Sequence, residues 1–273
     1  MPIIVTRPER EAKRWVADLC AQGFNALALP LIQIGPVHDQ GNLIATGLKL
    51  DSYVGVMFVS ANAVEHFFAC NPALASSLGA SGAANDRGRA WATGPGTVRA
   101  LQRAGVARGR IDAPPSDAVQ FDSEALWQIV GVQVHSGDCV LIVRGADANE
   151  GAELASGNGR EWFARKVVAT GASVEYAVSY QRLVPQLNAS ERELARRAAN
   201  DRSIWLFSSV QAVRNLHAVF PKQSWHQASA LATHARIAVE AKSAGFGVVL
   251  ESRPTLSDVL TALKSIDELR RQG

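Results

Sequence analysis

The chain has 273 residues, of which 47% are hydrophobic and 19% are charged, and its formal net charge is +3. These values are typical of a globular protein long enough for about two domains, and they exclude disordered and fibrous classes. No nucleic-acid partner is expected, because the mild charge forms no basic stripe. No metal site or disulfide framework is expected either, because Cys20, Cys70 and Cys139 are widely spaced and the histidines lack ligand spacing.

The first residues, 2–7, read as a short strand and lack the basic leader and apolar run of a signal peptide. No apolar stretch approaches a membrane span, which takes about 20 residues. The sequence therefore predicts a cytoplasmic protein with no membrane partner.

Apolar, strand-forming runs alternate with longer stretches of helical spacing. In chain order, strands are expected at 3–6, 26–34, 53–59, 90–93, 111–113, 140–144, 174–183, 203–207, 230–233 and 247–250. Helices are expected at 9–22, 43–50, 61–70, 96–104, 123–130, 161–170, 190–200 and 257–269. Strands of this kind separated by helices indicate parallel sheets covered on both faces. The stretches 77–89 and 145–159 read as mobile surface loops.

The two halves of the chain share short segments in the same order. FVSANAV at 58–64 returns as FSSVQAV at 207–213, and each copy follows a strand and opens a helix. ATGP at 92–95 likewise parallels ATHA at 232–235. Such self-similarity predicts an internal duplication of β-α units, with two similar lobes that form a cleft. The long strands at 26–34 and 174–183 are the expected crossings between the lobes.

Candidate site residues follow the strands, because ligands of open α/β sheets gather at the carboxyl ends. Thr6 and Arg7 follow the first strand, and Arg144 ends its counterpart, so the two arginines could hold an anion or could equally be ordinary surface residues. Ser60 and Ser209 stand where a strand gives way to a helix. A serine there caps the helix, and the same free N–H groups can hold a carboxylate or phosphate.

The turn Thr93-Gly94-Pro95-Gly96-Thr97 also leaves N–H groups free, but it is neither a P-loop nor a dinucleotide fingerprint. His234 and Arg236 occupy the equivalent turn of the second half, so one turn is basic and the other neutral. His66 and His217 read as helix-surface residues.

Read together, these segments resemble the bacterial type of uroporphyrinogen-III synthase. The similar segments are TRP at 6–8, PLIQI at 30–34, FVSANAV at 58–64, TGPGT at 93–97, VSYQR at 178–182, LFSS at 206–209 and HARIA at 234–238. They follow the family order over nearly the whole chain.

The resemblance implies an α/β fold of two flavodoxin-like, doubly wound lobes joined by two strand-like connectors. One lobe would comprise residues 1–34 with 184–273, and the other would comprise residues 35–183. The implied enzyme is a lyase that cyclises hydroxymethylbilane to uroporphyrinogen III, with inversion of ring D and loss of water. It uses no metal or cofactor. A monomer is expected, with substrate handed on from hydroxymethylbilane synthase.

The family pattern places Tyr180 near the departing hydroxyl, where a connector tyrosine packed at the hinge is the alternative. The substrate-contact candidates are Thr6, Arg7, Ser60, Ala61, Thr93, Gly94, Arg144, Ser209, His234 and Arg236. The chain departs from one common family form, which has a Gly-Pro-Thr-Thr turn at 234–237. A long spacer at 146–158 leaves the position of Arg160 open.

Two other classes are compatible with parts of the sequence. A non-catalytic, two-lobed binding protein would close on a small anionic ligand, and a redox flavoprotein would need a phosphate loop that neither half shows convincingly.

Overall fold

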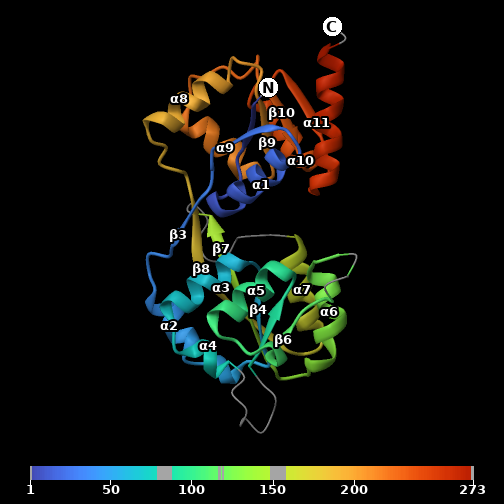
Figure 1. Ribbon diagram of the computed structural model, residues 1–273. Coiled ribbons are helices and arrows are strands. Elements are labelled where there is room, and N and C mark those ends of the chain that lie inside the picture. The colour runs from blue at the N-terminus through green and yellow to red at the C-terminus, as the bar shows by residue number, and fades with distance from the viewer. Residues whose placement is uncertain (1, 79–87, 116–117, 119, 148–157, 272–273) are drawn as a thin grey trace. The chain divides into compact units, whose positions relative to one another are not determined.

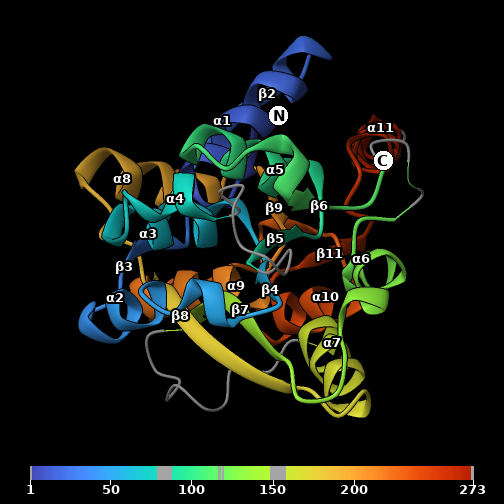
Figure 2. The same ribbon diagram turned by 90° about the horizontal axis from the view of Figure 1, so that it is seen from below.

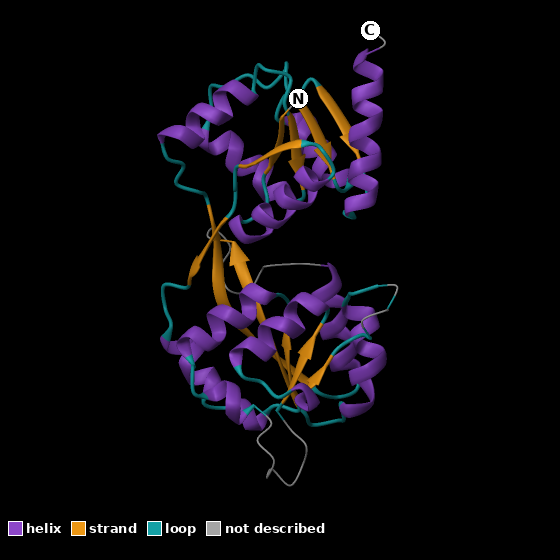
Figure 3. Ribbon diagram, in the orientation of Figure 1, coloured by secondary structure: helices purple, strands orange, loops and turns teal. Residues whose placement is uncertain are grey.

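The structure is a computed structural model that describes residues 2–78, 88–115, 118, 120–147 and 158–271. The chain divides into two compact units (Figure 1). Unit 1 comprises Met1–Gln33 with Leu183–Gly273, and unit 2 comprises Ile34–Arg182. In both units the strands lie among helices (Figure 3).

Unit 1 has a five-stranded sheet in the order β11-β10-β9-β1-β2, with every neighbouring pair parallel. Its strands are β1 (Pro2–Val5), β2 (Asn25–Ala28), β9 (Ile204–Phe207), β10 (Ser229–Ala232) and β11 (Val248–Glu251). Its helices are α1 (Glu9–Ala21), α8 (Ala189–Ala198), α9 (Val210–Val219), α10 (Ala235–Ser243) and α11 (Leu256–Arg271).

Alternate strand residues of unit 1 face two hydrophobic layers. Ile3 and Leu206 pack with Trp15 of α1 and Leu263 of α11. The intervening residues face an aromatic group in which Trp205 lies edge-on to Trp225, with ring centroids 5.2 Å apart. A parallel sheet buried on both faces explains why these strands read as continuous apolar runs.

Unit 2 has a six-stranded sheet in the order β3-β8-β7-β4-β5-β6. Its strands are β3 (Gln33–Pro36), β4 (Gly55–Phe58), β5 (Arg89–Ala92), β6 (Ile111–Asp112), β7 (Cys139–Asp147) and β8 (Ser173–Leu183). The β8-β7, β7-β4, β4-β5 and β5-β6 pairs are all parallel.

The helices of unit 2 cover both faces of its sheet. They are α2 (Gly41–Gly47), α3 (Ala61–Cys70), α4 (Leu74–Ser77), α5 (Pro95–Ala104), α6 (Ser123–Val130) and α7 (Asn158–Ala169), with short 3-10 turns at Leu50–Ser52, Arg108–Arg110 and Gly131–Gln133. Helices α3 and α5 pack on the face that carries Val56 and Phe58. Helices α6 and α7 lie together on the face that carries Met57 and Trp91 (Figure 2).

Five strands of each sheet have the same spatial order, but the chain forms these strands in a different sequence in the two units. In unit 1 the order β2-β1-β9-β10-β11 follows the flavodoxin pattern. In unit 2 the order β8-β7-β4-β5-β6 repeats it, so β7 and β8 take the places of β1 and β2 although they come last in the unit. The predicted fold class is confirmed, and the duplicated segments fall on β4 and β9 and on β5 and β10.

Two strand predictions were wrong. The run 26–34 is not one strand: it contributes to β2 of unit 1 and β3 of unit 2, separated by 29–32. Pro30 has no N–H with which to continue the ladder. The strand expected at 140–144 runs on to Asp147, because β8 pairs with it along its whole length.

Residues 79–87 and 148–157, which lie in the two expected surface loops, fall outside the described residues. Among the helices that the structure does describe, none is long and apolar enough to cross a membrane. No group of three or more His, Cys, Asp or Glu side chains that could hold a metal ion occurs within the described ranges.

Gly55 offers a test of the packing in unit 2. A Cβ atom there would overlap the indole ring of the fully buried Trp91, whereas a Cβ at Gly109 would meet nothing within 4 Å. Overpacking a core costs about 1–3 kcal/mol. We expect Gly55→Ala to lower the free energy of unfolding by about that amount in urea denaturation, and Gly109→Ala to leave it nearly unchanged. Equal effects of the two substitutions would contradict the packing described above.

Candidate active site

Ser60 and Tyr180 meet at the carboxyl edge of the unit 2 sheet, although 120 residues separate them in the chain. Ser60 follows β4 and caps α3, and its Oγ accepts a hydrogen bond from the backbone N–H of Ala63 at 3.1 Å. The same Oγ lies 3.3 Å from the hydroxyl oxygen of Tyr180 on β8. Two residues predicted for the site are therefore hydrogen-bonded to one another.

The Tyr180 ring is enclosed by neighbours that hold it in one orientation. Tyr180 is 4% exposed. The His66 ring of α3 lies 5.8 Å from it between centroids, and the Arg182 guanidinium carbon lies 5.9 Å from its centroid. On β7 the ring rests against the bare backbone of Gly145, and Asp147 forms an ion pair with Arg182 at 3.0 Å.

His66 was expected to lie on a helix surface, but it is half-buried against Tyr180. Burial lowers the pKa of His66, with a smaller opposing effect from Glu65. The imidazole is therefore mainly neutral at pH 7. It places a polarisable ring beside the tyrosine without adding a second positive charge next to Arg182.

Thr93 and Gly94 stand on the same edge as Ser60. Phe58 pairs with Ala92 in the parallel register, so the turns that follow β4 and β5 leave the sheet side by side. Gly94 is the N-cap of α5, and no side chain caps this helix. In its first turn Pro95 has no N–H and the Thr97 N–H donates to the Gly94 carbonyl at 3.1 Å, so the Gly96 N–H and the positive end of the helix dipole remain for a ligand.

Unit 1 has the same pair of turns at its own carboxyl edge, because Phe207 pairs with Ala232. Ser209 caps α9 and accepts from the N–H of Gln211 at 3.1 Å. His234 caps α10 through Nδ1, which accepts from the N–H of Arg236 at 3.2 Å. Both His234 and Arg236 are exposed, so this turn presents a cation where the unit 2 turn presents threonine and glycine.

Thr6 and Arg7 follow β1 in unit 1, and neither side chain is freely exposed. Thr6 is fully buried, and its hydroxyl donates to the Leu206 carbonyl at 2.8 Å. The Arg7 guanidinium lies 4.5 Å over the Trp15 ring and forms an ion pair with Glu11 at 3.2 Å. Thr6 therefore fixes the turn, and Arg7 is a partly covered cation beside it.

Arg144 is placed differently from the prediction. It does not end its strand, because β7 continues for three residues to Asp147. Arg144 is 4% exposed, and its guanidinium lies 5.2 Å from the centroid of the Tyr176 ring. A surface loop was expected over 145–159, but pairing with β8 keeps residues 145–147 in the sheet.

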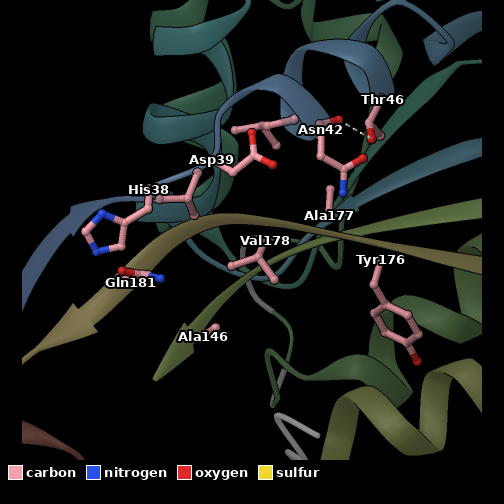
Figure 4. A pocket seen from close by; sticks show the side chains of 11 residues that line it. His38, Asp39, Asn42, Thr46, Ala146, Tyr176, Ala177, Val178 and Gln181 are labelled. Atoms are coloured by element: carbon pink, nitrogen blue, oxygen red, sulfur yellow. Dashed lines mark hydrogen bonds between the residues drawn. The ribbon is translucent and has the colours of Figure 1, made fainter. Parts of the chain in front are cut away.

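A separate hollow of about 380 Å³ lies in unit 2 beside β8 and α2 (Figure 4). His38 and Gln181 stand at one end of it and Tyr176 at the other, and Asn42 accepts a hydrogen bond from Thr46 through its backbone carbonyl at 2.8 Å. Its described lining includes neither Ser60 nor Tyr180. None of its residues was predicted as a site residue.

Known proteins resemble this chain in sequence family and in fold. The family model described as uroporphyrinogen-III synthase HemD matches residues 13–261. The crystal structure of uroporphyrinogen-III synthetase from Helicobacter pylori is 14% identical and has a TM-score of 0.57, with 97% of this chain and 100% of that chain covered. A mutant uroporphyrinogen III synthase from the extremely thermophilic bacterium Thermus thermophilus is 15% identical, with a TM-score of 0.49 and coverage of 97% and 98%.

The structural likeness to the Helicobacter protein supports the fold, and the family model covers most of the chain. The enzymes of this family cyclise hydroxymethylbilane in tetrapyrrole biosynthesis. This chain belongs to the uroporphyrinogen-III synthase family.

Proposed function

We propose that Tyr180 is the acid of the cyclisation and that the capped turns at Ser60, Thr93, Ser209 and His234 bind the substrate carboxylates. In this proposal hydroxymethylbilane closes to uroporphyrinogen III with inversion of ring D and loss of water. The observation that carries it is the 3.3 Å contact between Ser60 and Tyr180 at the carboxyl edge of the sheet.

The direction of that hydrogen bond decides what Tyr180 can do. Ser60 Oγ already accepts from the Ala63 N–H, and its one hydrogen can be donated to the Tyr180 oxygen. The phenolic hydrogen is then available for the substrate. Tyr180 donates it to the departing hydroxyl as the C–O bond breaks, so water leaves. The free α-carbon of ring D loses its proton when its new carbon–carbon bond forms, and this proton restores the phenol, so the balance is one water lost.

The substrate is bound through many weak contacts between its carboxylates and the protein. Hydroxymethylbilane carries eight carboxylates, and the start of a helix stabilises an anion through free N–H groups and the positive end of its dipole. We assign Ser60 with Ala61, and Thr93 with Gly94, to one set of contacts. Ser209, His234 and Arg236 form the other set. Arg7 and the buried Arg144 add positive potential, and Thr6 holds the turn that carries Arg7.

The difference in charge between the His234 turn and the Thr93 turn supports a role for these turns in selecting the product isomer. Inversion of ring D requires that the bond between its substituted α-carbon and the ring C methylene breaks and that this methylene bonds instead to the free α-carbon, so the site has to favour this path over direct closure by positioning and electrostatics. A cationic turn at His234 and Arg236 and a neutral turn at Thr93 and Gly94 treat the two ends of an unsymmetrical substrate differently.

We infer that the two units, with bounds at about 1–34 with 184–273 and 35–183, act as the two lobes of the enzyme. We infer that the enzyme is a cytoplasmic monomer that receives hydroxymethylbilane from hydroxymethylbilane synthase. The alternative of a non-catalytic binding protein is favoured only by the hollow in unit 2, which at about 380 Å³ suits a smaller ligand.

Product analysis tests the proposed function directly. Freshly made hydroxymethylbilane is given to the protein and the uroporphyrinogen isomers are separated. We expect the type III isomer to dominate, because spontaneous closure proceeds without ring inversion. An isomer ratio equal to that of the protein-free reaction would leave a binding protein as the better account.

Tyr180→Phe removes the phenolic proton and keeps the ring. General acid catalysis contributes about 10²–10⁴-fold, so we expect kcat to fall by roughly 10²-fold with little change in KM. Tyr176→Phe, on the same strand but 47% exposed, is the matched control and should keep its activity. Unchanged turnover in Tyr180→Phe would remove the acid role.

Arg236→Gln removes the exposed cation from the first turn of α10. We expect KM to rise several-fold with kcat nearly kept, and the difference from the unchanged enzyme to shrink at high salt, because salt screens exposed charges. Lys242→Gln, in the last turn of the same helix, is the control. A KM that rises equally in both variants would indicate a general charge effect.

A further inference from the structure

Strand β8 contains a β-bulge immediately before Tyr180. In the parallel register Arg144 pairs with Val178 and Gly145 pairs with Tyr180, so Ser179 is the extra residue that has no partner on β7. A bulge of this kind re-aims the side chains that follow it, and bulges are common next to active sites.

The bulge decides which face of the sheet Tyr180 occupies. Leu141, Val143 and Ala177 pack on the α3 side of the sheet. Regular alternation along β8 from Ala177 would place residue 179 on that side and residue 180 on the other. Tyr180 nevertheless belongs to the α3-side cluster, because the extra residue shifts the alternation by one. Without the bulge the phenol would face away from Ser60.

The Ser179 side chain ties the bulge to its surroundings. Ser179 is 1% exposed, and its hydroxyl lies 3.2 Å from the Ala63 carbonyl and 3.4 Å from the Arg144 carbonyl. A buried hydroxyl needs such partners. Ala63 is in the first turn of α3, the turn whose N-terminal cap, Ser60, contacts Tyr180. One side chain thus links β8, β7 and the capped end of α3.

Gly145 leaves the space that the Tyr180 ring occupies. A Cβ atom at this position would lie inside the van der Waals distance of three carbons of the Tyr180 ring. The ring is also buried, with His66 and Arg182 beside it, so little space is left into which it could shift. Any side chain at position 145 would displace the hydroxyl from Ser60.

We propose that Ser179 and Gly145 are positioning residues for the cyclisation, which together set the Tyr180 hydroxyl on Ser60. The proposal rests on the proposed acid role of Tyr180. It assigns the two residues no contact with substrate: they act through the phenol, and their effect must vanish when the phenolic oxygen is absent.

A double-mutant cycle tests this. Misplacing a reacting group by about 1 Å can cost roughly 10²-fold in rate, so we expect Ser179→Ala and Gly145→Ala each to lower kcat by about 10–10²-fold with KM nearly kept. In the Tyr180→Phe background we expect neither to cause a further loss. Ser179→Thr keeps the hydroxyl and should recover part of the rate lost in Ser179→Ala.

Gly131→Ala is the control for crowding alone, because its Cβ would lie 2.9 Å from the Trp127 ring, away from Tyr180. It should lower stability and leave kcat unchanged.

If Ser179→Ala does not fold, the same cycle is measured with Gly145→Ala and Ser179→Thr. Equal losses of kcat with and without the Tyr180 hydroxyl would overturn the positioning role and leave the acid role standing. If Tyr180→Phe itself kept full activity, the acid role would fall and with it this inference.

Discussion

Both sheets are held by hydrogen bonds between parallel strands, and a chain that pairs strands this way needs a helix to return it to the starting edge. Within each unit, this constraint places on one edge the strand-to-helix turns that follow the strands paired in parallel. It brings the Ser60 and Thr93 turns together in unit 2, and the Ser209 and His234 turns together in unit 1, through the Phe58–Ala92 and Phe207–Ala232 registers. Each unit therefore has its own pair of candidate binding turns, and neither pair needs a cluster of catalytic residues along the sequence.

The two units differ in the chain order and length of their strands and in the charge of their turns. They share a strand order, but unit 2 receives its equivalents of β1 and β2 last, as β7 and β8, and these two strands are long. The additional length carries the bulge at Ser179 and places Tyr180 on the α3 face. Unit 1 offers a cationic turn at the position where unit 2 offers a neutral one. Duplication thus explains the matching turns, and divergence explains the one tyrosine that we assign to the chemistry.

Much of the arrangement of strands and helices could be predicted from local sequence. Helix α3 was predicted with its observed bounds because Ser60 is a strong cap, and the matching segments indicated the duplicated turns. The contact of Ser60 with Tyr180 could not be predicted, because it joins residues 120 positions apart and depends on a bulge with no sequence signature. Arg144 was placed at a strand end because residues 145–159 read as a surface loop, whereas pairing with β8 keeps residues 145–147 in the sheet. His66 was assigned to the surface because no local signal shows which side of α3 meets Tyr180.

The chain has only three tyrosines, Tyr53, Tyr176 and Tyr180, so the phenolic carbons of protein labelled with carbon-13 at tyrosine Cζ give three resonances that Tyr→Phe variants can assign. Tyr53 donates to Glu175 at 2.6 Å, precedes β4 whereas Ser60 follows it, and serves as an internal reference. Adding uroporphyrinogen III under reducing conditions should shift the Tyr180 resonance and leave that of Tyr53 in place. A Tyr180 resonance that does not move while the product is bound would contradict the assignment of its hydroxyl to the reaction site.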